Sequence, residues 1–313
     1  DRYRNLRGRA DLRKVLKSGP GGLPVYRKRL LREYASIFGE NHSLSYRRWI
    51  QLVEQAAARP PCALPRGGSP GEGFLLVTVV IPIRNTGNEY LREAVASVCR
   101  QSYPRWELFL VADFPLEPLL PSIKEAFEED ASRVKVLSGG GGLGFHDLVN
   151  QALETASGEY LAFLDQSDVL AEHALLRLVT SVGSHLEGEI FYTDEDRIDR
   201  DGVRFDPFFK PGWSPDYFYS RDYVSRLAFF RKNLLIQSGG LRPGPAREAW
   251  FELLLRCLSQ AGDRVVHVPG VLCHHRCDSP DTSSGPGEEV HDGWNCTGLL
   301  EEYLASRSRG KVL

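Results

Sequence analysis

Between residues 74 and 185 the chain alternates apolar, strand-length segments with helical segments of about ten residues or more. The apolar runs predict strands at residues 75–83, 106–113, 134–137 and 160–165. Helical spacing of apolar residues predicts helices at residues 90–101, 116–128, 145–155 and 171–185. Parallel strands need long crossover connections, so buried strands joined by helices favour a mainly parallel sheet with helices on both faces. The sequence therefore predicts an α/β fold.

Beyond residue 190 the alternation is less regular. The run Asp194-Glu195-Asp196 is either a solvated acidic turn or part of a site for a divalent cation, and residues alone leave both interpretations open. Residues 207–219 are rich in Pro and aromatic side chains, as in a segment that contacts substrate. Regular structure is expected again at residues 227–231, 250–260, 264–268 and 298–306.

The N-terminal part of the chain differs in charge from the rest. Residues 1–60 carry 14 Lys and Arg against 5 acidic residues, which leaves 25 basic and 36 acidic residues for positions 61–313. Helical spacing followed by a Pro- and Gly-rich stretch predicts a basic helical arm with a linker over residues 1–73 and a separate domain over residues 74–313. The arm is either a solvated helical face or a surface for anionic lipid or an acidic partner. Nucleic acid is not expected, because the arm has no recognisable nucleic-acid-binding motif.

Localisation is predicted from what the sequence does not contain. No apolar run approaches the roughly 18 residues of a membrane span, and the first residues do not resemble a secretory signal. Six cysteines are too few for a disulfide scaffold in a chain of 313 residues. We expect a cytoplasmic protein whose basic arm can contact the inner face of a membrane. The absence of Met suggests a segment of a longer protein.

The segment GEYLAFLDQSDVL, residues 158–170, is the first candidate for chemistry. Its apolar strand leads directly into Asp165 and then Asp168, and ligands of open α/β sheets bind at the carboxyl ends of strands. Carboxylates suit Mg²⁺ and Mn²⁺, so the pair predicts a divalent cation site. Ser167 stands where such a site would be expected to have a further carboxylate.

Two further motifs have more than one interpretation. The glycine run at residues 139–142, with Gly144, follows a strand and precedes a helix, so it is half of a dinucleotide fingerprint or a permissive loop beside a ligand. The sequence VLCHHRC, residues 271–277, with His267, His291 and Cys296, offers ligands for zinc. Its spacing is not that of paired zinc motifs. A His and an Arg that face a phosphate are therefore favoured over a zinc site.

Four blocks carry a resemblance to a known family. They are VTVVIPIRN, LREAVASVCRQSYPRWEL, GEYLAFLDQSDVLAEHAL and YTDEDRIDRDGVRFDPFFKPGWSPD, in that order along the chain. Over residues 76–308 the sequence resembles a family 2 glycosyltransferase of the bacterial O-antigen or rhamnan-assembly kind. The resemblance implies a GT-A fold and inverting transfer of a sugar from a nucleoside diphosphate, UDP or dTDP, to a polysaccharide or lipid-linked glycan. It also implies a divalent cation, Mg²⁺ or Mn²⁺, and a second transferase domain in the parent protein.

The same resemblance assigns roles to individual residues. The implied nucleotide-binding residues are Pro82, Arg84, Asp113, Asp165 and Arg276, with His274 beside Arg276 at the diphosphate. The implied metal ligands are Asp165, Asp168 and His274.

The sequence departs from the family pattern at several of these places. Ser167 replaces the principal metal ligand, Ala112 the first of two paired acids, and Arg84 a tyrosine. In the pattern D-x-D-L-x-x-R the first Asp is the catalytic base, and here Trp250 stands in its place. Glu252 and Glu248 are then the candidate bases. Two hypotheses follow, an active glycosyltransferase and a degenerate transferase domain that acts as a binding or scaffolding module beside an active domain.

Overall fold

The computed structural model describes residues 42–54, 75–84, 90–139, 143–277 and 297–308. The chain divides into two compact units, residues 1–59 and residues 60–313, which are described separately. Of the first unit, the described part is the helix α3 (His42–Trp49), which continues as the π-helix η2 (Ile50–Glu54). The remainder of the predicted basic arm and linker lies outside the described residues, so the division at residue 73 stays a prediction.

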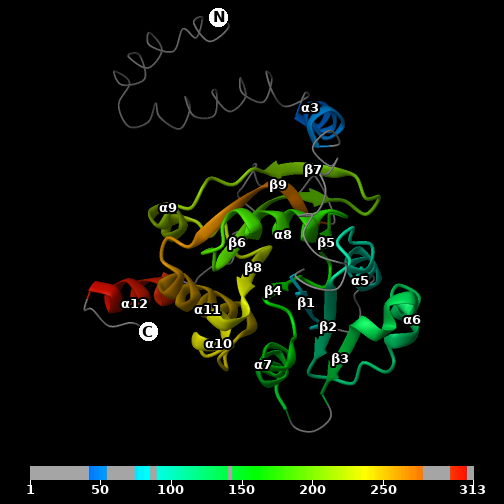
Figure 1. Cartoon of the computed structure of the whole chain (residues 1–313), viewed down its shortest axis with the longest axis horizontal. Helices are drawn as coiled ribbons and strands as arrows, with labels where there is room; N and C mark the ends of the chain where they lie inside the picture. The colour runs from blue at the N-terminus through cyan, green and yellow to red at the C-terminus, as the bar shows by residue number, and fades with distance from the viewer. Residues whose placement is uncertain (1–41, 55–74, 85–89, 140–142, 278–296, 309–313) are drawn as a thin grey trace, which may run out of the picture. The chain divides into compact units, whose positions relative to one another are not determined.

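The second unit is built on one sheet of nine strands within the described residues (Figure 1). The strands are β1 (Val77–Pro82), β2 (Trp106–Ala112), β3 (Val134–Ser138), β4 (Tyr160–Phe163), β5 (Val169–Leu170), β6 (Ile190–Ile198), β7 (Arg204–Phe208), β8 (Ala228–Arg231) and β9 (Val265–Arg276). Their order is β3-β2-β1-β4-β8-β6-β9-β5, and β7 pairs with β6. The first four strands in this order are parallel, as the alternating pattern predicts. Strand β8 is antiparallel to both β4 and β6, so it joins the parallel half of the sheet to a mixed half.

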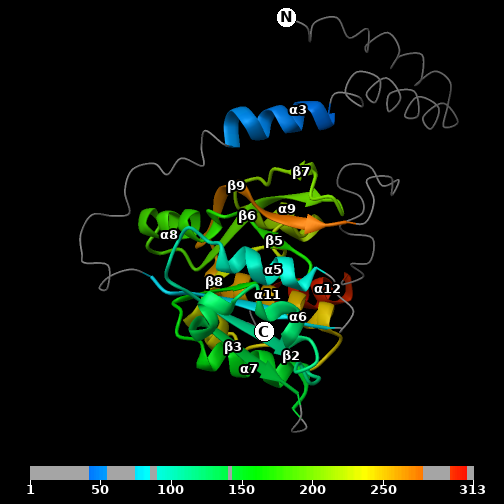
Figure 2. The same ribbon diagram turned by 90° about the vertical axis from the view of Figure 1, so that its right-hand side faces the viewer.

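Helices cover both faces of the sheet (Figures 1 and 2). They are α5 (Leu91–Cys99), α6 (Leu120–Lys124), the 3-10 helix η3 (Glu128–Arg133), α7 (Phe145–Thr155), α8 (Ala174–Ser184), α9 (Pro215–Ser220), α10 (Lys232–Gln237), α11 (Ala246–Ala261) and α12 (Thr297–Ser308). Alternate residues of a strand face opposite sides of the sheet, which produces two apolar cores. Val80 packs with α7, α10 and α11, whereas its neighbours Val79 and Ile81 pack with α5 and α8.

Glycine at position 139 allows two strand ends to approach each other. A Cβ atom on Gly139 would lie 2.3 Å from the backbone oxygen of Asp113, which no side chain can tolerate. Glycine at this position therefore lets the end of β3 lie directly against the end of β2. The remaining glycines of the run, residues 140–142, lie outside the described residues.

The structure differs from the sequence prediction in three elements. The acidic run at residues 194–196 is not a solvated turn but part of β6, whose nine residues are all buried. The histidine- and cysteine-rich segment is the continuation of β9, which extends well beyond the predicted residue 268. Helix α11 begins at Ala246, four residues before the predicted start. No helix in the described part of the chain has the length and apolar character needed to cross a membrane.

Candidate functional site

A cavity of about 440 Å³ opens where strands β1 and β4 end. Pro82 and Arg84 line it from the end of β1, and Phe163, Leu164 and Asp165 from the end of β4. The opposite wall comes from α11, and further lining residues come from β6, β8, β9 and the loop before β8. The cavity therefore lies at the carboxyl end of the parallel strands, where α/β folds bind ligands.

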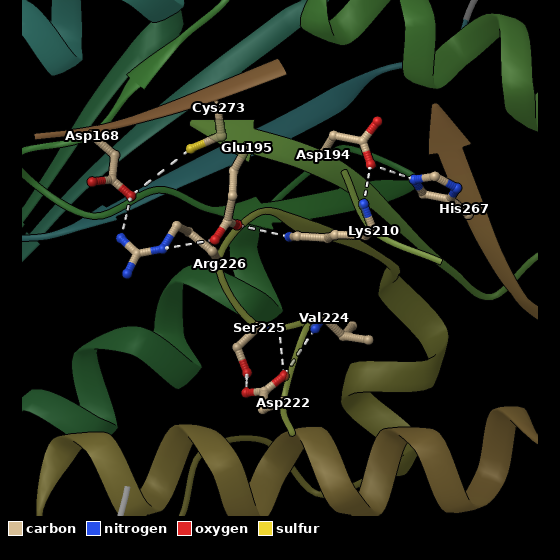
Figure 3. Close-up of polar contacts among 10 residues, drawn as sticks. All are labelled: Asp168, Asp194, Glu195, Lys210, Asp222, Val224, Ser225, Arg226, His267 and Cys273. Carbon is tan, nitrogen blue, oxygen red and sulfur yellow. Dashed lines mark hydrogen bonds and ion pairs between the residues drawn. The ribbon is translucent and has the colours of Figure 1, made fainter. Parts of the chain in front are cut away.

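A series of charged side chains in contact with one another forms one wall of the cavity (Figure 3). Arg226 lies between two carboxylates, 3.5 Å from Asp168 Oδ2 and 3.6 Å from Glu195 Oε1. Glu195 Oε2 lies 2.7 Å from Lys210 Nζ, and the Lys210 side chain is only 1% exposed. His275 Nδ1 lies 2.7 Å from the other oxygen of Asp168. Burial of such charges is tolerated because each one faces an opposite charge.

The pKa of Asp168 reflects this arrangement. Burial by itself would raise the pKa of this carboxyl group, but the hydrogen bond with His275 and the charge of Arg226 hold the pKa below its usual value. Asp168 and Glu195 raise the pKa of Arg226, although burial alone would lower it. The contacts of Asp168 with His275 and Arg226 therefore favour its ionised form.

Asp165 is engaged at both of its carboxylate oxygens. Oδ2 accepts a hydrogen bond of 3.1 Å from Arg84 Nη2. Oδ1 accepts from the Ser167 hydroxyl at 2.8 Å and from the Ser167 backbone N–H at 3.1 Å. The backbone N–H of Arg84 donates to Gln166 Oε1 at 2.9 Å, which ties the end of β1 to the loop after β4. The arrangement holds the guanidinium of Arg84 against Asp165 at the cavity.

The α11 side of the cavity is apolar and aromatic. Trp250 lies against Phe163 with 4.3 Å between ring centroids, and Phe163 also contacts Phe230 at 6.2 Å. Leu253 and Leu254 continue this wall along the helix. The cavity thus has one charged wall and one apolar wall, a combination suited to a ligand with an ionic part and a less polar part.

Asp222 is a fourth carboxylate on the cavity, and it lies apart from the series of charged side chains that ends at Lys210 (Figure 3). It accepts hydrogen bonds from the backbone N–H groups of Val224 at 2.9 Å and Ser225 at 3.1 Å, and from the Ser225 hydroxyl. Burial raises its pKa above the ordinary value, and these hydrogen bonds offset only part of the effect. Within the described residues Asp222 has no ion-pair partner, and its raised pKa favours the acceptance of a proton.

Asp194 and Asp196, the other two acidic residues of β6, make contacts outside the cavity lining. Asp194 accepts from the backbone N–H groups of Lys210 and Gly270, each at 2.8 Å, and lies 2.7 Å from His267 Nε2. Asp196 Oδ1 lies 2.6 Å from His274 Nδ1. Of the run Asp194-Glu195-Asp196, only Glu195 lines the cavity.

Four of the predicted site residues come together at the cavity, namely Pro82, Arg84, Asp165 and Asp168. Asp113 is exposed just beyond β2 and is not part of the cavity lining. On β9 the prediction selected His274 and Arg276, but the lining residue is His275, because successive strand side chains alternate between faces. Arg276 instead contacts Glu93, donates to the backbone oxygen of Asp199 at 2.7 Å and lies over the Tyr90 ring.

Neither predicted base on α11 lines the cavity. Glu252 Oε2 accepts from Arg256 Nη2 at 2.6 Å, and its Oε1 accepts from Arg242 Nη1 at 2.8 Å. Glu248 is exposed. The face of α11 toward the cavity carries Arg247, Trp250, Leu253 and Leu254, so helical geometry directs positions 248 and 252 elsewhere.

The residues present do not fit a bound divalent cation. Among the described residues, no group of three or more His, Cys, Asp and Glu side chains is placed to hold a metal ion. Of the predicted ligands, Asp165 and Asp168 are paired with arginines, and His274 is paired with Asp196. For the zinc interpretation, His291 and Cys296 lie outside the described residues, and Cys273 is buried with its sulfur 3.8 Å from Asp168.

Several cavity residues were not selected from the sequence. Lys210, Asp222, Arg226 and Arg247 come from loops and from the first turn of α11. Lys210 lies within the Pro- and aromatic-rich segment at residues 207–219, which is the one available signal. The other three lie in positions where isolated charged residues usually face solvent, so no sequence pattern distinguished them.

Comparisons with known proteins identify the family of the chain and agree with its fold. The model of the family described as Glycosyl transferase family 2 matches residues 78–237, about half of the chain. The chain therefore belongs to glycosyltransferase family 2. Two relatives are an uncharacterised protein, y4gI, of Sinorhizobium fredii, 33% identical over 239 residues, and the O-antigen biosynthesis protein RfbC of Myxococcus xanthus, 36% identical over 209 residues. These matches cover 76% and 67% of this chain but only 26% and 16% of the respective relatives.

Solved structures show the same fold at lower sequence identity. The S. aureus TarS fragment 1–349, in complex with UDP, is 17% identical with a TM-score of 0.52, over 65% of this chain and 61% of that one. The mannosyltransferase PcManGT from Pyrobaculum calidifontis, in complex with GDP-Man and Mn²⁺, is also 17% identical with a TM-score of 0.52, over 89% and 74%. The fold is of the GT-A type, as the sequence predicts.

Proposed function

We propose that this domain binds a nucleoside diphosphate sugar in the cavity and transfers the sugar, with inversion, to a growing polysaccharide or lipid-linked glycan. The observation that carries the proposal is the meeting of Pro82, Arg84 and Asp165 at the ends of β1 and β4, on one wall of a cavity of about 440 Å³. That volume is within the range of small-molecule sites. A relative named for O-antigen biosynthesis and neighbours bound to UDP and GDP-Man support the substrate class.

Asp222 is the base in this proposal. A carboxylate paired with an arginine is a weak base, and Asp165, Asp168 and Glu195 are all paired with cations. Asp222 accepts only from neutral donors, so it retains the basicity needed to take a proton. In the inverting reaction it would remove the proton of an acceptor hydroxyl. The hydroxyl oxygen then forms a bond to the anomeric carbon from the face opposite the diphosphate, which leaves with the electrons of the broken C–O bond.

Calorimetric titration with UDP, dTDP, GDP and their sugars tests the binding part of the proposal, and product analysis with a lipid-linked glycan acceptor tests transfer. Binding of one nucleotide at micromolar to millimolar concentration is expected. The absence of binding by all three nucleotides at millimolar concentration would overturn the proposed function. The second transferase domain, the cytoplasmic location and the membrane contact through the basic arm stay predictions.

A second candidate function is a binding module that has lost transferase activity. The observation that favours it is Trp250, which takes the place of the family's catalytic carboxylate on the cavity wall and packs against Phe163. A module of this kind would bind nucleotide or sugar without turnover. Binding together with no transfer and no donor hydrolysis, in a preparation that includes the full parent protein, would select this candidate over the enzyme.

A further inference from the structure

We propose that this cavity binds the diphosphate of its ligand directly through arginine side chains, with Arg84 as the principal contact, and that binding requires no divalent cation. The inference rests on the proposed function, because it concerns how a nucleoside diphosphate is held. It differs from the metal-dependent mode that the family resemblance implies.

The first observation is that Arg84 takes the position a cation would need at Asp165. A divalent metal requires open carboxylate oxygens. At Asp165, Oδ2 lies 3.1 Å from the Arg84 guanidinium, and Oδ1 already accepts two hydrogen bonds from Ser167. Ser167 is itself a neutral hydroxyl at the position of the family's principal metal ligand, and this hydroxyl donates to Asp165. Both carboxylate oxygens of Asp165 therefore have hydrogen-bond partners without a metal.

The second observation is that Asp168 cannot turn toward a metal without cost. Its side chain is 1% exposed, and its two oxygens face His275 at 2.7 Å and Arg226 at 3.5 Å. To release Asp168 would break the contacts that a buried carboxylate makes with Arg226 and His275, which is unfavourable. Asp168 therefore serves to orient Arg226 and His275, and contributes no free ligand oxygen.

The third observation is the balance of charge on the cavity wall. Four carboxylates, Asp165, Asp168, Glu195 and Asp222, face five cationic side chains, Arg84, Arg197, Lys210, Arg226 and Arg247. Arg247 is exposed, and within the described residues it has no ion-pair partner. Arg197 is also paired with Asp206, 3.4 Å away and outside the lining, so Arg247 is the cation of this wall that is available to a diphosphate.

The geometry of Arg84 also suits phosphate. A guanidinium presents five N–H donors, and one nitrogen bonded to Asp165 leaves others for phosphate oxygens. The side chain is 47% exposed, so a ligand can reach it from the cavity. Asp165 holds the guanidinium in place before the ligand arrives, which reduces the entropy lost on binding.

Titration calorimetry with UDP, dTDP and GDP, in 1 mM EDTA and separately in Mn²⁺, tests the inference. Equal affinity in the two buffers, within about twofold, is expected. Binding that appears only with Mn²⁺ would overturn the inference and leave the proposed function standing. Failure of all three nucleotides to bind in either buffer would overturn both.

Variants of Arg84 assign the contact. Arg84→Ala should lower nucleotide affinity in EDTA about 10- to 100-fold, the usual effect of losing a hydrogen bond between charged groups. Arg84→Lys keeps the charge but not the fork of donors, so it should restore the affinity only in part. Arg92→Ala is the matched control, because Arg92 also pairs with a carboxylate, Glu125 at 2.7 Å, but does not line the cavity. Unchanged affinity in Arg84→Ala, with the protein folded by circular dichroism, would contradict the assignment.

Discussion

The ring of Trp250 lies 4.3 Å from the ring of Phe163, centroid to centroid, with their planes at 56°. The contact joins α11 to the end of β4 at the cavity wall, directly beside Leu164 and Asp165. Trp250, at the position where the family resemblance implies a catalytic carboxylate, thus contributes packing to the wall. The consequences of this exchange can be measured.

Trp250→Ala should reduce the free energy of unfolding by about 2 to 4 kcal/mol, because it removes a large ring from a partly buried apolar wall. Chemical denaturation measures the change. Trp250→Phe keeps an aromatic contact with Phe163 and should lose less than half as much. Equal stability of Trp250→Ala and the unmodified protein would show that the wall does not depend on this contact.

Glu252→Gln should destabilise the fold, because Glu252 compensates Arg256, whose side chain is 1% exposed. The expected loss is about 2 to 4 kcal/mol in the free energy of unfolding. Nucleotide affinity should not change, since Glu252 does not line the cavity. Glu248→Gln, on the exposed part of the same helix, is the matched control, with an expected change within about 0.5 kcal/mol. A variant Glu252→Gln that keeps full stability but loses sugar transfer would instead restore Glu252 as the catalytic base.

Asp194 should make the fold sensitive to acid. Burial alone would raise its pKa, but hydrogen bonds from His267, Gly270 and Lys210 hold the pKa below its ordinary value of 3.8. The fold therefore favours the ionised form, and this stabilisation is present above pH 3.8 and is lost as the pH falls through the lower pKa of the folded protein. Asp194→Asn should be less stable at pH 7 and should lose less stability between pH 5 and pH 3. Parallel pH profiles for the two proteins would contradict this.

Asp222 should have the opposite dependence on pH. Its pKa is raised from 3.8 by burial, so the fold favours the protonated form and loses stability as the pH rises through the raised pKa. Asp222→Asn keeps an oxygen acceptor for the Val224 and Ser225 N–H groups, and should remove this loss of stability.

If Asp222 is the base, the same variant, Asp222→Asn, lowers sugar transfer about 10²- to 10⁴-fold. Transfer at the unmodified rate would remove Asp222 from the mechanism.

Ser167→Asp should change how the cavity responds to metal. A third carboxylate beside Asp165 and Asp168 adds negative charge near the diphosphate, so nucleotide affinity in EDTA should fall. Mn²⁺ should recover part of that affinity, because the new carboxylate can supply a metal ligand. Ser167→Asn is the neutral control and should not respond to Mn²⁺. Titration calorimetry in both buffers distinguishes the two variants, and an equal response would contradict the expectation.

The parallel half of the sheet was predictable because its strands are buried on both faces. Continuous apolar runs such as the one that ends at Pro82 allow little else. The acidic run of β6 was not predictable in the same way, since three consecutive acids are normally exposed. They become strand residues here only because Lys210, Arg226, His267 and His274 reach them from distant parts of the chain. Local sequence does not contain those contacts.

The candidate site also contains residues that could be predicted from the sequence and residues that could not. Asp165 and Asp168 could be selected because they come after a predicted strand, and the carboxyl ends of parallel strands meet at one edge. Arg84 is selected only by the family resemblance. The distinction between His274 and His275 depends on the strand register of β9, which a shift of one residue would reverse. Asp222 and Arg247 reach the cavity through the path of loops and the rotation of α11, which no short motif determines.

Lys210 connects the two sides of strand β6. Its backbone N–H donates to Asp194, while its ammonium group lies 2.7 Å from Glu195 on the cavity wall. A shift of the segment around Lys210 therefore moves a positive charge toward or away from the ligand. The loop between β7 and α9, although it contributes little of the cavity surface itself, can in this way adjust the electrostatic potential that a bound diphosphate experiences.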